Sequence, residues 1–251
     1  MRSTIALVAG LAIGAPALAG FATIDFSVED DFLTPLMNGQ EINAAGPSSE
    51  FGTLFTISST QRLSIFDTSN PGPNAGGGDP DLLVNQGNAL IIQNPQMLTQ
   101  STADIFNTPD DSRFGGTILF NFINPAGLSS VDLLDVDDAN GVTVTLTDDQ
   151  GRQRVYDVPN SFTNEVNTDG PAGFDTLSLI DVSPQLGEGG GVATLTSEDA
   201  GYDPARVVTL AVTFAGSGGL DNLAIDSVVP TPGAVALMGL SGLTLIRRRR
   251  A

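Results

Sequence analysis

Strict alternation of apolar and polar residues is the feature that most constrains what this chain can fold into. In GVTVTLT at 141–147, Val142, Val144 and Leu146 alternate with threonines. Successive side chains of a β-strand point to opposite faces, so this pattern predicts a strand with one buried face. A chain that repeats the pattern is expected to bury its apolar faces against one another in an all-β fold.

Four further segments have the same character. They are RVVTLAVTF at 206–214, GGTILFNFI at 115–123, and the shorter runs NALIIQ at 88–93 and LSIFD at 63–67. In the first of these we expect Val208, Leu210, Val212 and Phe214 to share the buried face.

Clusters of glycine, proline, asparagine and aspartate separate these runs and predict tight connections. They are SNPGPNAGGGDPD at 69–81, DDANG at 137–141, DDQG at 148–151 and LGEGGG at 186–191. Close spacing of turns predicts an antiparallel β-sandwich of jelly-roll kind with one core, the extracellular domain, over residues 20–228. The one helix that we expect in this region lies near Asn94 to Phe106.

Residues 1–19 have the layout of a secretory signal peptide. Arg2 gives a positive start, an apolar stretch follows, and Ala17 and Ala19 are the small residues of a cleavage site. The alternative, a buried N-terminal helix, fits poorly with a strand-rich chain. We therefore expect signal peptidase to cleave after Ala19 and the protein to be exported.

The exported part is strongly acidic. All 29 acidic residues lie in residues 20–228 against five arginines, so this region carries a net charge of −24, and the chain has no lysine. Such a field repels phosphate at long range, which argues against nucleic acid and anionic lipid as partners of this region. It suits a secreted protein in salty surroundings or one that gathers divalent cations.

Missing residue types narrow the chemistry further. The chain has no cysteine, histidine or tryptophan. Disulfides, a Ser-His-Asp triad, a cysteine nucleophile and an ordinary zinc site are excluded, and the absence of lysine excludes a Walker P-loop and Schiff-base catalysis. Carboxylate and oxygen-ligand chemistry remains.

Acidic loops are the candidate metal site. Asp67 ends one apolar run, Asp79 and Asp81 precede another, and Asp111, next to Asp110, lies in the loop NTPDDSRFGG. Calcium needs six to eight oxygen ligands, and these loops could return several carboxylates to one place. The alternative is that they are solvated turn residues, so structural calcium is an expectation and no cofactor is certain.

Carboxylates are the residues on which catalysis by this chain would depend. An enzyme of this composition would be a glycoside hydrolase with a pair of carboxylates. The six glutamates, none of which sits in a distinguishing motif, are Glu29, Glu41, Glu50, Glu165, Glu188 and Glu198. We expect no catalytic residues and no enzyme.

Two segments resemble modules of known proteins. Residues 65–151 look like a β-sandwich module that recurs in exported bacterial surface proteins, which implies a fold and a location. GSGGLDNLAIDSVV at 216–229 is similar to the last strand of many jelly-roll modules, several of which bind carbohydrate. Their sugar platforms use tryptophan or tyrosine, and here only Tyr156 and Tyr202 are available.

The C-terminal segment, residues 229–251, has three parts. Val229, Pro230, Thr231 and Pro232 form a hinge, and an uncharged run of 14 residues follows from Gly233 to Ile246. A spanning helix needs about 20 apolar residues, so this run is short for a transmembrane helix. Four arginines close the chain and belong on the cytoplasmic side by the positive-inside rule; they are Arg247, Arg248, Arg249 and Arg250.

This layout resembles the PEP-CTERM sorting signal of bacterial exported proteins, although the family usually has glutamate where this chain has Thr231. The resemblance implies secretion, a transient hold in the membrane and processing near Pro-Thr-Pro by an exosortase-type sorting enzyme. Family members are commonly linked to exopolysaccharide, biofilm matrix or the cell surface. The alternative is a plain single-span anchor.

Three functions stay open at this point. The first is a sorted, non-catalytic structural or interaction protein of the cell surface or extracellular matrix. The second is a calcium-dependent carbohydrate-binding module, and the third is a glycoside hydrolase.

Overall fold

The computed structural model describes residues 22–29, 31, 33–42, 50–77, 80–102, 104–136, 140–163 and 173–228. The described residues form strands and turns and contain no helix, so the all-β prediction is confirmed. Their fifteen strands are β1 (Ala22–Ile24), β2 (Glu41–Ile42), β3 (Phe55–Ser59), β4 (Leu63–Asp67), β5 (Asn88–Ile92), β6 (Gln100–Thr102), β7 (Ile105–Phe106), β8 (Gly116–Leu134), β9 (Val142–Asp148), β10 (Gln153–Val158), β11 (Phe174–Ser178), β12 (Gln185–Leu186), β13 (Val192–Glu198), β14 (Val207–Phe214) and β15 (Gly219–Val228).

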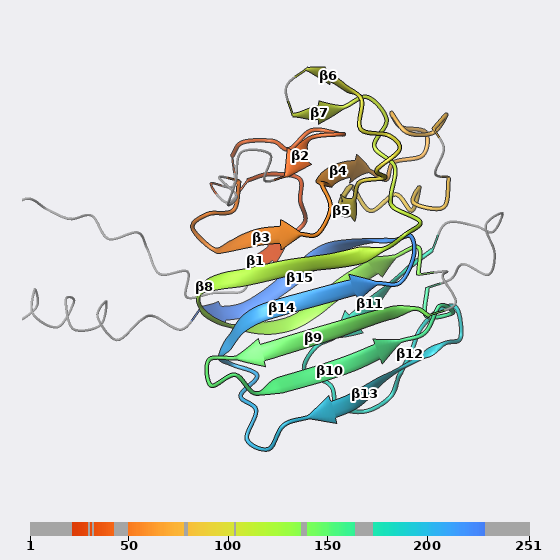
Figure 1. Ribbon diagram of the computed structural model, residues 1–251. Helices are drawn as coiled ribbons and strands as arrows, with labels where there is room; N and C mark the ends of the chain where they lie inside the picture. Colours follow the sequence, from red (N-terminus) through yellow and green to blue (C-terminus); the bar gives the residue numbers. More distant parts are fainter. Residues whose placement is uncertain are drawn as a thin grey trace, which may run out of the picture.

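The long strand β8 joins two layers of one antiparallel sheet (Figure 1). Its first part pairs with β14 on one side and β3 on the other, and β14 continues through β9 and β10 to β13. Its last part pairs with β15 and β11, and β15 continues through β5 and β4 to β2. The first part of β8 with β3, β14, β9, β10 and β13 forms the β14 layer. The last part of β8 with β11, β15, β5, β4 and β2 forms the β15 layer. The arrangement is sandwich-like.

The sequence of β8 explains its change of partners. The strand contains Pro125, which has no N–H for a ladder. Ladder pairs with β3 end at Phe122, and the pairing with β14 shifts in register before Ala126. The strand therefore leaves one layer for the other where its backbone cannot pair regularly.

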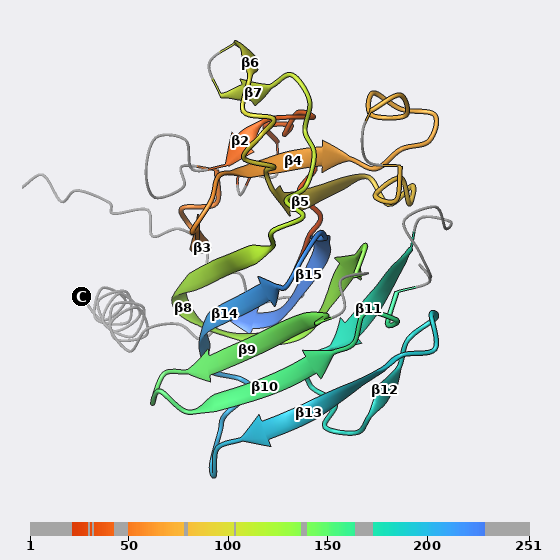
Figure 2. The ribbon, with the colours of Figure 1, turned by 45° about the vertical axis from the view of Figure 1, so that its right-hand side comes forward.

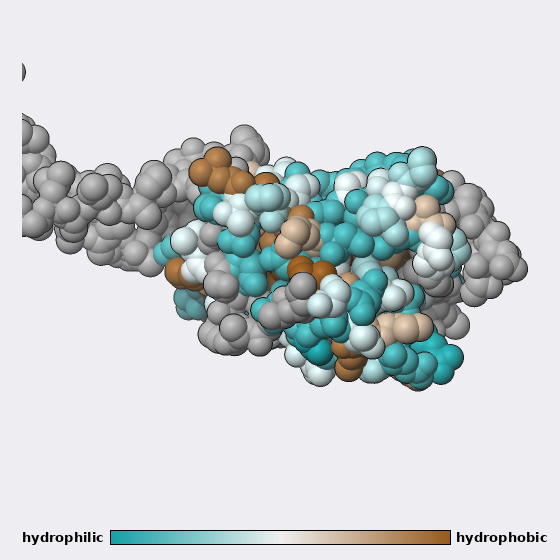
Figure 3. Space-filling view, turned by 90° about the horizontal axis from the view of Figure 1, so that it is seen from above, coloured by the Kyte–Doolittle hydropathy of each residue, from teal (hydrophilic) through white to brown (hydrophobic). Residues whose placement is uncertain are grey.

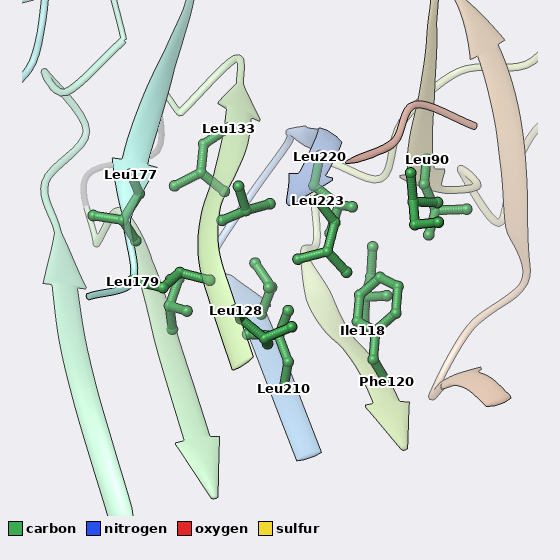
Figure 4. Packing of buried hydrophobic residues seen from close by; sticks show 14 of the residues in the cluster. Leu90, Ile118, Phe120, Leu128, Leu133, Leu177, Leu179, Leu210, Leu220 and Leu223 are labelled. Carbon is green, nitrogen blue, oxygen red and sulfur yellow. The ribbon is translucent and has the colours of Figure 1, made fainter. Parts of the chain in front are cut away.

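One continuous core lies between the layers (Figure 4). Ile118, Phe120 and Leu210 of the β14 layer point toward Leu133 and Leu223 of the β15 layer, and all five are buried. Burial of large apolar side chains contributes about 1.5–3 kcal/mol each, so this core is the main stabilising feature. The five segments predicted as strands supply 14 of the 36 buried residues in this cluster.

The outer face of the β15 layer is covered as well. Phe66, Ile91 and Leu134 pack there against Leu82 and Leu83 of the loop before β5. This cover explains why β4 and β5 read as nearly continuous apolar runs instead of strict alternations.

Two local predictions are wrong. The helix expected near Asn94 to Phe106 is absent from the described residues of that segment, which instead form turns and the β6–β7 hairpin (Figure 2). Val208 is only half-buried, because a register shift between Val207 and Thr209 turns Val207 into the core. Such a bulge reverses side-chain direction along a strand.

The two ends of the chain lie outside the described residues. Ala17 and Ala19 of the predicted signal, and the whole tail from Val229, including Pro230, Thr231, Pro232 and the four arginines, belong to this part. Among the residues that the structure does describe, no helix is long and apolar enough to cross a membrane.

Candidate functional site

The acidic residues predicted to bind calcium are held in separate contacts. The Asp67 carboxylate accepts a hydrogen bond from the Ser69 N–H at 2.9 Å, at the end of β4. Asp111 is buried, and its Oδ2 accepts a hydrogen bond from the N–H of Gly218. Asp79 lies outside the described residues.

Asp81 and Asp110 are the acids that the structure shows to interact here. The pKa of Asp110 is raised, chiefly by burial and also by the charge of Asp81. A hydrogen bond from Asn94 at 2.6 Å opposes this rise. Among the described residues no group of three or more acidic side chains is placed to hold a metal ion. Calcium at these loops therefore stays a prediction.

A different acidic site lies on the outer face of the β15 layer. Asp221 of β15 stands directly opposite Asp132 of β8 in the antiparallel ladder. Residues directly opposite share a face of the sheet, with Cβ atoms about 4.5–5.5 Å apart. Thr176 of β11 is opposite Asp132 on its other side, so a polar row crosses three neighbouring strands.

Asp132 is well provided with hydrogen bonds. Its Oδ1 accepts one from the Thr176 hydroxyl at 2.5 Å, and its Oδ2 accepts one from the Asn222 side-chain amide at 2.8 Å. Both donors are neutral. The Asp132 side chain is thus fixed in place without a cationic partner in these contacts.

Asp221 is fully buried and only half satisfied. Its Oδ1 accepts a hydrogen bond from the N–H of Asn222 at 2.7 Å, whereas its Oδ2 has no hydrogen-bond partner. Burial raises the pKa of Asp221 to about 8, and the charges of Asp132 and Asp25 add to the rise. The carboxyl group is therefore destabilised as an anion by its surroundings.

Local backbone geometry sets this arrangement. Asn222 has a positive φ of 48°, and the pairing of β15 with β8 shifts in register between Asp221 and Ala224. The irregularity lets Leu220 and Leu223 both reach the core while Asp221 turns to the outer face. Asparagine tolerates this backbone region better than most residues.

The sequence interpretation missed this pair, although a signal was present. In SSVDLLDVDD, Asp132 interrupts an apolar run, and in GSGGLDNLAIDSVV, Asp221 follows Leu220. A charged residue inside a buried strand is uncommon unless it is paired. That the two interruptions face each other depends on the register of strands far apart in the chain.

The described arrangement offers little to sugar chemistry. Tyr156 is fully buried and Tyr202 is 8% exposed, so neither tyrosine presents a face for stacking on a sugar ring. Glu41 and Glu198 are engaged in ion pairs with Arg62 and Arg154. The Asp132–Asp221 pair is buried, and what it is suited to hold is a small cation or a proton.

Comparison with protein-family models finds no match to this chain, and no curated protein matches its sequence.

Proposed function

We propose that this chain is an exported, C-terminally sorted β-sandwich that serves as a non-catalytic protein of the cell surface or extracellular matrix. The observation that carries the proposal is the tail, in which a Pro-Thr-Pro hinge, an uncharged run and four arginines follow one another. The signal-like first 19 residues agree with it. Signal peptidase, an exosortase-type enzyme and, transiently, the membrane are its proposed partners.

The place of the tail in the sequence, directly after the described strands, supports this proposal. β15, the last strand among the described residues, ends at Val228, one residue before the hinge. Cleavage near Pro230 or Thr231 would leave every described strand intact. We propose that the sandwich has jelly-roll topology and that helices at both ends, a signal helix and a short transmembrane helix, complete the precursor.

Glycan binding with the help of calcium is the second candidate. The observation in its favour is the excess of carboxylates that are outside the four described ion pairs. Buried tyrosines count against an aromatic platform, so a glycan such as exopolysaccharide would be held by polar loops. A glycan array with and without calcium tests this candidate, and release of reducing sugar tests hydrolysis.

Mass spectrometry of surface material tests the sorting proposal. We expect the wild-type chain, expressed in its own host, to lack RRRRA at its C-terminus. A variant with Arg247→Gln, Arg248→Gln, Arg249→Gln and Arg250→Gln should retain an uncleaved tail, because positive charge holds the segment in the orientation that processing needs. Thr231→Glu, which supplies the residue usual in the resembling family, should be processed at least as completely as wild type.

Arg113→Gln is the matched control, since Arg113 is an exposed arginine of the folded domain. It should be processed like wild type. Wild-type surface protein with an intact RRRRA end would contradict sorting by cleavage and favour a retained anchor.

A further inference from the structure

The Asp221 carboxyl group is the least well satisfied charge-bearing group in the described site. It is 0% exposed, and one of its oxygens meets no donor. Buried carboxylates are normally paired, hydrogen-bonded or bound to a metal ion, because removal from water disfavours the charged form. The protein groups around Asp221 supply no hydrogen-bond partner to Oδ2.

The neighbours of Asp221 further disfavour its charged form. Asp132 lies directly opposite on the same face, and Asp25 contributes a further negative charge. Like charges directly opposite each other in a sheet are destabilising. The four described ion pairs use Glu41, Asp148, Asp149 and Glu198, so none of them neutralises this pair.

We propose that Asp221 and Asp132 together bind a divalent cation, Ca²⁺, across the pairing of β8 and β15. The unpartnered Oδ2 of Asp221 and the Asp132 carboxylate are the two charged ligands. Calcium takes six to eight oxygens, including main-chain carbonyls and water, and tolerates irregular geometry. Oxygen donors select hard cations of this kind over zinc or copper.

The site differs from an assembly of three or more acids, which the described residues do not contain. Two carboxylates would be completed by neutral oxygens such as main-chain carbonyls and water. The pairing of β15 with β8 is irregular directly beside them, between Asp221 and Ala224. Thr176 and Asn222 hold Asp132 in position with their hydrogen bonds. The cation would fasten β15 to β8, the strand that joins the two layers.

Titration of the metal-free full-length chain with CaCl₂ alone tests the proposal. We expect one Ca²⁺ per chain by calorimetry and a higher melting temperature in CaCl₂ than in EDTA. Asp221→Asn and Asp132→Asn should each weaken binding by roughly 100-fold, because each removes one of two charged ligands. In EDTA, Asp221→Asn should melt above wild type, since it removes a buried like-charge contact.

Two further variants locate the cation. Asp157→Asn changes an exposed aspartate on β10, in the other layer, and should bind calcium like wild type. Asp81→Asn should also keep wild-type binding. If Asp81→Asn loses binding while Asp221→Asn keeps it, the cation sits at the loops and the inference is overturned.

A wild-type melting temperature that is the same in CaCl₂ and in EDTA overturns the inference as well. That result would mean that a proton, shared within the Asp132–Asp221 pair, replaces the cation. If Asp221→Asn does not fold, the wild-type calcium titration and the Asp132→Asn variant still test the proposal.

Discussion

At the scale of single residues, buried aspartates in this fold behave differently according to their donors. Asp221 has one donor and a raised pKa, whereas Asp148, at the end of β9, has several. The Asp148 carboxylate accepts hydrogen bonds from the side chain and N–H of Arg152 and from the N–H groups of Gln150 and Asp203. It therefore ties the β9–β10 turn to the loop before β14.

Asp148 should make the fold sensitive to acid. Burial alone would raise its pKa, but the hydrogen bonds from Arg152, Gln150 and Asp203 outweigh burial and lower the pKa to about 2. The Asp148 carboxylate therefore contributes its full share of stability above its pKa in the unfolded chain, roughly 3.9. That stability is lost as the pH falls toward 2. We expect Asp148→Asn to reduce the free energy of unfolding by about 1–3 kcal/mol at neutral pH.

Chemical denaturation of wild type and Asp148→Asn between pH 7 and pH 2 checks this. The difference between the two should shrink below pH 4. The exposed Asp157→Asn serves as control and should change stability little at any pH. A difference that stays constant down to pH 2 would show that the Asp148 charge does not matter.

At the scale of elements, the hairpin of β9 and β10 has a glycine at each end, and the two differ in how much space surrounds them. Gly141, before β9, and Gly151, in the turn, have φ of 63° and 77°. A Cβ at position 141 would lie 2.1 Å from the Val158 carbonyl oxygen, whereas a Cβ at 151 would meet nothing within 4 Å. Only Gly141 is required both for its φ and for the close approach.

Gly141→Ala and Gly151→Ala therefore form a matched pair. Both substitutions impose a left-handed backbone on alanine, at a cost of roughly 1–2 kcal/mol. Gly141→Ala should lose about 1–3 kcal/mol more, since the Val158 backbone must move. Urea denaturation measures both losses, and equal losses would argue against the close approach of Gly141 to β10.

At the scale of the whole molecule, negative charge is in large excess. Four of the five arginines of the folded region are in ion pairs, and Arg113 lies over the Phe114 ring. Four of the described acids take part in these ion pairs, and others, such as Asp157 and Asp199, are exposed. Seen from above, this surface is mainly hydrophilic with separate apolar patches (Figure 3).

Salt should therefore stabilise the protein. Raising NaCl from about 0.02 M to about 1 M shortens the screening length from roughly 20 Å to about 3 Å and weakens repulsion among the acids. We expect the melting temperature, measured in EDTA to exclude effects of calcium, to rise by several degrees. A fall would mean that the four ion pairs matter more to stability than the excess of like charge.

The sequence by itself determined the strand content of this protein. Val142, Val144 and Leu146 are buried as their alternation predicted, and so are Ile118 and Phe120, because side-chain direction along a strand follows from local backbone geometry. Turn residues such as Gly151 were recognised for the same local reason. The proposals for the two ends also rest on sequence alone.

Tertiary structure alone decided the candidate site. Asp132 and Asp221 are 89 positions apart, and they meet because β8 and β15 pair in one particular register. Local pattern gives the face that a residue occupies within its own strand, but the pairing partner depends on contacts between distant segments. The positive φ of Asn222 and the burial of Asp221 depend on packing in the same way.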